Sequence, residues 1–205
     1  IPRSRTEEGL SLDTLTLSEE QQRAYEGIRA LCTSGEPQAA LLFGVTGSGK
    51  TQVFVKLIEA CLRDGKQAML LVPEISLTPQ LLAKFRGLFG EKIAVIHSSL
   101  SMGERLDAYK RIERGEAQIS IGTRSSIFAP FQNLGLIILD EEGEHSYKSD
   151  TTPRYHARDI AKLRCVWHKA TLLLASATPS VESYYAAQTG RYHFFELKER
   201  YGEAD

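Results

Sequence analysis

The stretch Gly44–Thr51, with the sequence GVTGSGKT, decides the fold because it matches the pattern G-x-x-x-x-G-K-[ST] in full. Before it lies an apolar run, Ala39–Phe43, which predicts a buried strand. After it, apolar residues from Val53 to Leu62 follow in two rows at helical spacing, and Asp64-Gly65 is a stop signal. A glycine-rich turn between a strand and a helix is the setting that supports such a match. The sequence therefore predicts a phosphate-binding loop in an α/β domain.

Each residue type in this loop has a physical role in holding a chain of phosphates. Glycines allow backbone N–H groups to point inward around the anion, and the helix N-terminus adds positive potential. Lys50 is expected to place its charge at the β- and γ-phosphates of ATP, and Thr51 its hydroxyl on Mg²⁺. The predicted cofactor-binding residues of the loop are Gly44, Thr46, Gly47, Ser48, Gly49, Lys50 and Thr51.

A second candidate element is the acidic end of another apolar run. Leu136–Leu139 predicts a buried strand that continues into Asp140, Glu141 and Glu142. In an open α/β sheet, ligands bind at the carboxyl ends of the strands. Asp140 is expected to hold the Mg²⁺ ion and Glu141 to orient or deprotonate the attacking water. With Lys50, these two acids are the predicted catalytic residues. The alternative interpretation of the three acids is a solvated acidic turn without a catalytic role.

The remaining pattern predicts a mostly parallel sheet with helices on both faces, because apolar strands alternate with amphipathic helices. Helices are expected to begin at the capping box Ser18-x-x-Gln21, at Thr78-Pro79 and at Ser101. A later helix carries Ile160, Leu163 and Trp167 on one face, and Pro179 is expected to open the last one. The other predicted strands are Ala68–Val72, Ile93–Ile96, Ile119–Ile121 and Leu172–Ala175.

The composition excludes several classes of protein. The 205 residues are 42% hydrophobic and 25% charged, as in globular domains, and no apolar run approaches the length of a membrane span. A net charge of −1 means that any DNA contact must use local patches. The three cysteines have no metal-ligand spacing, so we expect no zinc site, reduced core thiols and a cytoplasmic location. Both ends of the chain are expected to continue into a longer protein.

Together, the phosphate loop and D-E-E resemble the superfamily 2 helicases and translocases. Three further segments resemble motifs of that family: Val72–Thr78 (VPEISLT), Ile121–Ser125 (IGTRS) and Ser176–Pro179 (SATP). The segment Arg154–Asp159 (RYHARD), which follows S-Y-K, is the most specific one and resembles the bacterial replication-restart DNA helicases. The resemblance covers about residues 15–197.

What the resemblance implies is the first RecA-like, ATP-binding lobe of an ATP-dependent 3′→5′ DNA helicase. Residues 15–197 would form that lobe, with linkers at 1–14 and at 198–205, the latter leading to a second lobe. The implied partners are single-stranded and forked DNA, the second lobe, primosome proteins and single-strand-binding proteins. We expect a monomeric chain in the bacterial cytoplasm that binds ATP and Mg²⁺ but does not unwind DNA by itself.

The resemblance also assigns roles to individual residues. Gln21 matches the glutamine that recognises adenine, with Gln22 as the second choice and a purely capping role for Gln21 as the alternative. Ser176 and Thr178 would couple the nucleotide state to DNA. The alternative for Thr178 is an ordinary N-cap with Pro179 at the first helical position.

Two groups of residues are predicted to contact DNA. Thr123 and Arg124 follow a strand and can reach a phosphate by hydrogen bond and charge. Aromatic rings interleaved with cations suit single-stranded DNA, because bases stack on rings while phosphates pair with charges. The predicted residues of this second group are Tyr147, Lys148, Arg154 and Tyr155. A tyrosine-bearing surface loop is the alternative.

One position departs from the family pattern. Many relatives have D-E-E-H, whereas Gly143 follows the three acids here, so an imidazole that would link the acidic motif to S-A-T is missing. This departure leaves open a nucleotide-gated binding module without motor action. A repair translocase of the same superfamily is a weaker alternative, and a small-molecule kinase leaves S-A-T and I-G-T-R-S unexplained.

Overall fold

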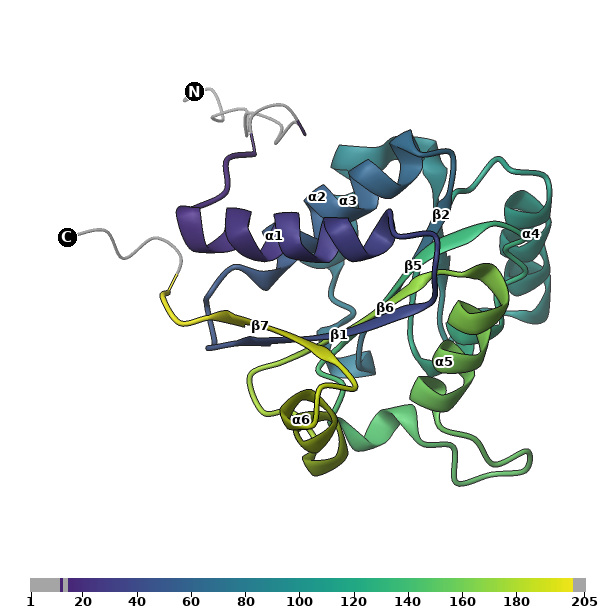
Figure 1. Ribbon diagram of the computed structural model, residues 1–205. Coiled ribbons are helices and arrows are strands. Elements are labelled where there is room, and N and C mark those ends of the chain that lie inside the picture. The colour runs from purple at the N-terminus through teal and green to yellow at the C-terminus, as the bar shows by residue number, and fades with distance from the viewer. Residues whose placement is uncertain (1–11, 13–14, 201–205) are drawn as a thin grey trace, which may run out of the picture.

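Seven strands form one sheet in the computed structural model, which describes residue 12 and residues 15–200. The strand order is β3-β4-β2-β5-β6-β1-β7, and every neighbouring pair is parallel (Figure 1). The strands are β1 (Gln38–Gly44), β2 (Gln67–Leu71), β3 (Ile93–Ile96), β4 (Ile119–Gly122), β5 (Leu134–Asp140), β6 (Thr171–Ser176) and β7 (His193–Leu197). The predicted parallel α/β sheet is confirmed.

Helices cover both faces of the sheet, as the unbroken apolar strands predict. One core cluster joins the sheet to α1, α2 and α3, and a second joins it to α4, α5 and α6. Neighbouring strand residues alternate between the two clusters, so that Leu42 packs in the first and Leu41 in the second. The helices are α1 (Glu19–Cys32), α2 (Lys50–Arg63), α3 (Pro79–Phe89), α4 (Met102–Glu113), α5 (Ala157–His168) and α6 (Val181–Gln188).

Three of the predicted helix starts, those at Ser18, Thr78 and Ser101, are confirmed. Ser18 and Gln21 form the reciprocal capping box of α1. Thr78 caps α3 with Pro79 at its first position, and Ser101 caps α4. These side chains accept hydrogen bonds from first-turn N–H groups, which have no partner inside the helix.

The exposed face of α5 was not expected. Leu163 and Trp167 lie at the surface, with exposed fractions of 48% and 72%. The face on the sheet consists of Ala157, Ala161 and Cys165, all buried. The buried face thus carries small side chains, which let the helix lie close to the sheet.

The last helix and the last strand also differ from the prediction. The helix α6 begins at Val181, and its N-cap is Ser180, whose hydroxyl accepts a hydrogen bond from the Ser183 N–H at 3.1 Å. The interpretation of Thr178 as an N-cap is therefore wrong. Strand β7 was missed because most of its residues are exposed or half-buried and form no apolar run.

Several further expectations concern the whole chain. The linkers predicted at 1–14 and 198–205 lie mostly outside the described residues. Cys61 and Cys165 are buried free thiols, and burial raises the pKa of each to about 12. Within residues 15–200, no helix combines the length and the hydropathy that crossing a bilayer requires.

Candidate nucleotide-binding site

The strand order brings three sequence motifs to one edge of the sheet. Strand β6 lies between β5 and β1, and its last residue, Ser176, pairs with Phe43, the neighbour of Gly44. On the other side of β6, Asp140 pairs with Ala175. The phosphate loop and the acidic motif are therefore two strands apart, with the start of S-A-T between them. All strands are parallel, so these ends are the carboxyl ends at which α/β sheets bind ligands.

The loop from Gly44 to Thr51 has the backbone of an anion-binding turn. Gly47 and Gly49 have φ of +80° and +79°, in the left-handed region that favours glycine. The Lys50 ammonium donates a hydrogen bond to the Gly44 carbonyl at 2.9 Å. A Cβ atom at Gly44 would lie 2.7 Å from the Ser48 hydroxyl, so only glycine fits there.

The Ser48 hydroxyl is buried and finds no hydrogen-bond partner among the described residues. Leaving a buried polar group unpaired costs about 1–3 kcal/mol. A phosphate oxygen in the loop would supply the missing partner. The loop therefore fits a phosphate group by its backbone, by its lysine and by this orphaned hydroxyl.

Asp140 is nearly buried at the end of β5. Burial raises the pKa of its carboxyl to about 6, against the lowering effects of the Lys50 charge and of the Glu141 N–H, which donates to it at 2.9 Å. A cavity of about 370 Å³ is lined by both Thr51 and Asp140. A hydroxyl and a carboxylate beside a phosphate site suit Mg²⁺, which takes few protein ligands and completes its shell with phosphate and water.

Glu141 has an unusual backbone. Its φ is +50°, which costs a residue with a side chain about 1–2 kcal/mol. Such strain persists only where the surroundings over-determine it. The side chain of Glu141 is exposed, next to Asp140, where a water attacking the terminal phosphate would have to be held. Its predicted role as a general base stays a prediction.

Gln21 is buried and holds the phosphate loop from α1. Its Oε1 accepts a hydrogen bond from the Ser18 N–H at 2.8 Å, which confirms the capping interpretation. Its amide nitrogen donates to the carbonyls of Ser48 and Gly49 at 3.3 and 3.1 Å. Gln22 is exposed and contacts Glu26. Adenine recognition by either glutamine stays a prediction.

The S-A-T segment turns back on itself at the end of β6. The Ser176 hydroxyl is buried and accepts a hydrogen bond from the Thr178 N–H at 2.9 Å, while the Thr178 side chain is exposed. The coupling role proposed for both residues is not tested by these contacts.

Among the predicted DNA-binding residues, Tyr147 is a clear correction. It is 0% exposed, and its hydroxyl lies 3.0 Å from the Leu71 carbonyl and 2.5 Å from the Asp140 carbonyl. A ring in this position cannot stack on a base. Its aromatic bulk fills the second core cluster, and its hydroxyl supports the strand ends that carry the acidic motif.

The other predicted DNA contacts lie at or near the surface, except Thr123, which is 4% exposed. Arg124 donates to the carbonyls of Ser146 and Lys148, and its guanidinium lies 5.9 Å from the centre of the Tyr155 ring. Lys148 and Arg154 are exposed, and Tyr155 is half-buried.

Glu142, for which the sequence pattern indicated no role, contacts three side chains. Its carboxylate is fully buried and contacts Ser180, Ser183 and Arg158. The sequence signal for this cluster was a third acid directly after an apolar strand. About forty residues later, two serines lie at a helix start.

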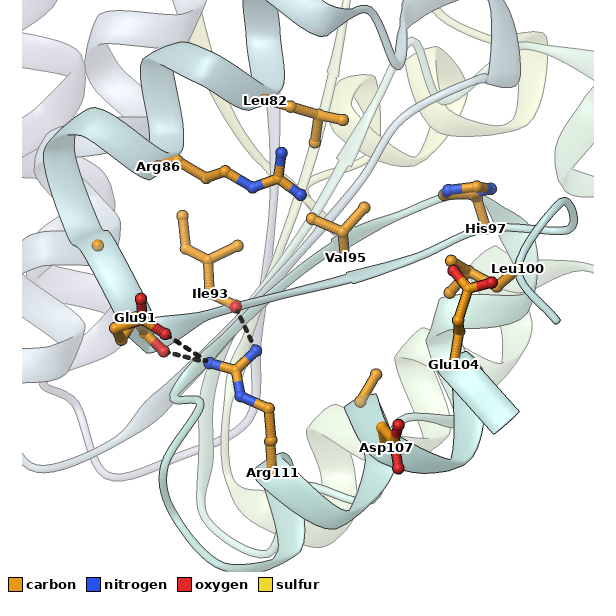
Figure 2. Close-up of a pocket in the computed structure, with 12 residues that line it drawn as sticks. Leu82, Arg86, Glu91, Ile93, Val95, His97, Leu100, Glu104, Asp107 and Arg111 are labelled. Atoms are coloured by element: carbon orange, nitrogen blue, oxygen red, sulfur yellow. Dashed lines mark hydrogen bonds and ion pairs between the residues drawn. The ribbon is translucent and has the colours of Figure 1, made fainter. Parts of the chain in front are cut away.

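A separate pocket of about 610 Å³ lies between α3, α4 and the edge strand β3 (Figure 2). In it Arg111 donates to the Ile93 carbonyl at 3.1 Å and contacts Glu91. Arg111 therefore ties α4 to the edge strand of the sheet. None of the predicted nucleotide-binding residues lines this pocket.

A protein-family model described as "DEAD/DEAH box helicase" matches residues 18–186. The chain belongs to the DEAD/DEAH box helicase family. Membership implies the use of ATP with a divalent metal ion.

Individual relatives agree with this family. The chain is 50% identical over 188 residues to the replication restart protein PriA of Bacillus subtilis (strain 168), covering 92% of this chain and 23% of that protein. The structure of RecG bound to a three-way DNA junction matches 93% of this chain and 25% of its own, with a TM-score of 0.67 and 25% identity. The Hef helicase domain of Pyrococcus furiosus matches 91% of this chain and 39% of its own, with a TM-score of 0.64 and 21% identity. The predicted RecA-like fold of a first helicase lobe is confirmed.

Proposed function

We propose that the chain is the ATP-binding first lobe of an ATP-dependent 3′→5′ DNA helicase that acts in replication restart at stalled forks. The observation that carries this proposal is the meeting of Lys50, Thr51 and Asp140 at one sheet edge, beside the orphaned Ser48 hydroxyl. Similarity to PriA over 92% of the chain supports the biological role. Residues 15–197 form the lobe, and 1–14 and 198–205 are linkers.

Different residues of the site would bind the phosphates, hold the metal ion and accept a proton. The loop N–H groups and the Lys50 ammonium would hold the β- and γ-phosphates, with Gln21 fixing the loop. Thr51 and Asp140 would hold the Mg²⁺ ion, which offsets charge on the phosphates when it is bound. Glu141 would accept the proton of the attacking water.

The site needs a further group for full activity. Hydrolysis of ATP by such motors is accelerated by an arginine that reaches the γ-phosphate from another domain or subunit. We infer that a second RecA-like lobe supplies it. The chain by itself would then bind nucleotide, turn it over slowly and unwind no DNA.

A cluster of orphaned polar atoms supports DNA as the partner. The Nε atom of Arg124 and the hydroxyls of Ser125 and Ser146 are buried without partners among the described residues. All three residues line a pocket of about 350 Å³ together with Thr123. One further hydroxyl without a partner in the part of the chain that the structure describes, that of Ser120, lies singly within a strand. A backbone phosphate is an anion of a size and hydrogen-bonding capacity that this cluster would satisfy.

We propose that Lys148, Arg154 and Tyr155 extend this contact along single-stranded or forked DNA. The RecG structure, which holds a three-way DNA junction, supports DNA binding by this fold. The proposal also includes primosome and single-strand-binding proteins as partners. It further includes a monomeric state, a bacterial cytoplasmic location, Mg²⁺ as the metal and the lack of a zinc site.

The first test is to measure ATP binding and hydrolysis by this chain, with and without forked DNA. Measurable binding with little turnover is expected. Strong DNA-stimulated turnover would show that the chain completes its own site, and failure to bind Mg·ATP would refute the nucleotide site. A Glu141→Gln variant, expected not to hydrolyse ATP, distinguishes a helicase motor from a nucleotide-gated binding module. If its DNA binding still follows nucleotide occupancy, the binding module is favoured.

A further inference from the structure

We propose, on the basis of the nucleotide site inferred above, that Glu142 is a positioning residue that couples this site to the segment Tyr147–Arg158. Its carboxylate joins three stretches of chain: the acidic motif itself, the residues after S-A-T, and R-Y-H-A-R-D. Asp140 and Glu141 would respond to the nucleotide, and Glu142 would pass that response to the segment that carries the proposed DNA contact Tyr155.

The contacts of Glu142 reach both of the other stretches. Its Oε1 accepts a hydrogen bond from the Ser180 N–H at 2.6 Å. Its Oε2 accepts from the hydroxyls of Ser180 and Ser183 at 3.1 and 2.8 Å. The Arg158 guanidinium lies 3.5 Å from the same oxygen and donates to the Ser180 hydroxyl at 3.2 Å. One carboxylate thus holds the start of α6 and the first turn of α5.

The contacts of the Glu142 carboxylate are buried, which makes them costly to break. The Glu142 side chain is 0% exposed, and that of Arg158 is 14% exposed. A buried carboxylate without its partners is costly, so movement of one partner has to be followed by the others. Charge-assisted hydrogen bonds of this kind are also shorter and stronger than neutral ones. A rigid cluster is the kind of element that can transmit a displacement.

The backbone connects this cluster to the nucleotide side. The Glu142 N–H donates to the Ala175 carbonyl at 3.1 Å, next to Ser176. The residue before it, Glu141, is held at a φ of +50°. This left-handed turn leaves the Glu141 side chain exposed beside Asp140 while that of Glu142 is buried against α6. Any change of backbone at Glu141 therefore acts directly on the buried carboxylate.

Gly143 permits this arrangement. A Cβ atom there would lie 3.1 Å from the Thr178 carbonyl and 3.3 Å from the Ser180 N–H. The backbone of the acidic motif consequently lies directly on that of the S-A-T-P-S segment. A side chain at position 143 would need this backbone to shift by a few tenths of an ångström, and the Glu142 carboxylate links the acidic motif to Ser180 and Ser183, which follow S-A-T.

Hydrogen–deuterium exchange on this chain tests the proposal, with Mg²⁺ and a non-hydrolysable ATP analogue as the probe. In the parent chain, the analogue is expected to change amide exchange in peptides covering 176–188 and 147–158. In Glu142→Gln, which keeps the size of the side chain, the change in 147–158 is expected to be lost. Affinity for the analogue should stay within about threefold, equivalent to less than 1 kcal/mol.

Two further variants control for a merely structural effect. Glu144→Gln neutralises an exposed acid two residues away and is expected to keep the parent's response. Ser183→Ala removes one hydrogen bond to Glu142 and is expected to weaken the response of 147–158 without abolishing it. Ser183→Ala also serves where Glu142→Gln fails to fold.

The outcomes separate the two proposals. If the parent binds the analogue but 147–158 does not respond, or if Glu142→Gln responds as the parent does, the coupling role is wrong and the nucleotide site stands. If the parent does not bind the analogue at all, the nucleotide site itself is wrong, and the coupling role falls with it.

Discussion

The phosphate loop Gly44–Thr51 and the segment Tyr147–Arg158 are both rich in residues typical of binding sites, but they use them in opposite ways. In the loop, the Ser48 hydroxyl is buried and has no partner within the described part of the chain, and Gly47 and Gly49 have left-handed backbones. In the segment, Tyr147 and Arg158 are used internally, on two backbone carbonyls and on Glu142, whereas Lys148 and Arg154 are exposed. The hydroxyl of Ser48, at the phosphate loop, therefore points to a ligand, whereas the hydrogen-bonded Tyr147 and Arg158 point to a structural role.

The largest effect expected from this comparison is on nucleotide binding. Lys50→Ala should weaken the binding of Mg·ATP about 10- to 100-fold, because a hydrogen bond to a charged group contributes roughly 1.5–3 kcal/mol. Fluorescence titration with a labelled nucleotide would measure it. Arg63→Ala, at the exposed far end of the same helix, is the control and should leave affinity unchanged. Unchanged binding in Lys50→Ala would overturn the assignment of the loop.

The Asp140→Asn substitution should stabilise the fold while it removes ATP hydrolysis. Burial holds the pKa of Asp140 at about 6, above its ordinary 3.8, so the charged form at pH 7 destabilises the nucleotide-free fold. Because the folded state retains the proton more strongly, this destabilisation develops as pH rises from about 4 to 6. Asn should raise the free energy of unfolding at pH 7 by roughly 1–3 kcal/mol and abolish hydrolysis.

Urea denaturation at pH 7 and an ATPase assay would measure the two effects. A variant that is less stable than the parent at pH 7 would contradict the account of a destabilising buried charge. Retained hydrolysis would contradict the metal-binding role of Asp140.

The two tyrosines of the second segment should behave differently. Tyr147→Phe removes a buried hydroxyl from two carbonyls and should cost about 1 kcal/mol of stability, with no direct effect on DNA affinity. Tyr155→Ala should instead weaken binding of single-stranded DNA, by about 1–3 kcal/mol for each base that stacks on the ring. Denaturation curves and fluorescence anisotropy with labelled DNA distinguish them, and the reverse pattern would restore Tyr147 as the DNA contact.

The smallest effect is expected on the outer face of α5. Trp167→Ser should change stability by less than about 0.5 kcal/mol, because the side chain is 72% exposed. Ala161→Ser, a smaller chemical change on the buried face of the same helix, should destabilise more, since it buries a hydroxyl against the sheet. Thermal unfolding of the two variants would show which face packs inward, and a larger loss from Trp167→Ser would refute the assignment.

Local patterns were sufficient to predict much of the fold and the backbone of the phosphate loop. The phosphate loop, the acidic strand end and the capping boxes at Ser18 and Thr78 depend on neighbours within a few residues, so their geometry follows from sequence. The α5 face was misjudged because Leu163 and Trp167 are more apolar than Ala157 and Ala161, although the smaller residues pack closer. Helix propensity and the spacing of apolar residues do not predict how closely a helix lies against its sheet.

The amino-acid sequence by itself determined the α/β class and the family and predicted the phosphate loop, since each rests on contiguous segments with their own backbone requirements. Only the tertiary structure decided that Tyr147 is buried and that Glu142 joins residues forty positions apart. It also placed the end of β6 between the phosphate loop and Asp140. The physical reason is that burial and charge pairing depend on which segments meet across the sheet, and the strand order that sets those meetings is not encoded in any one segment.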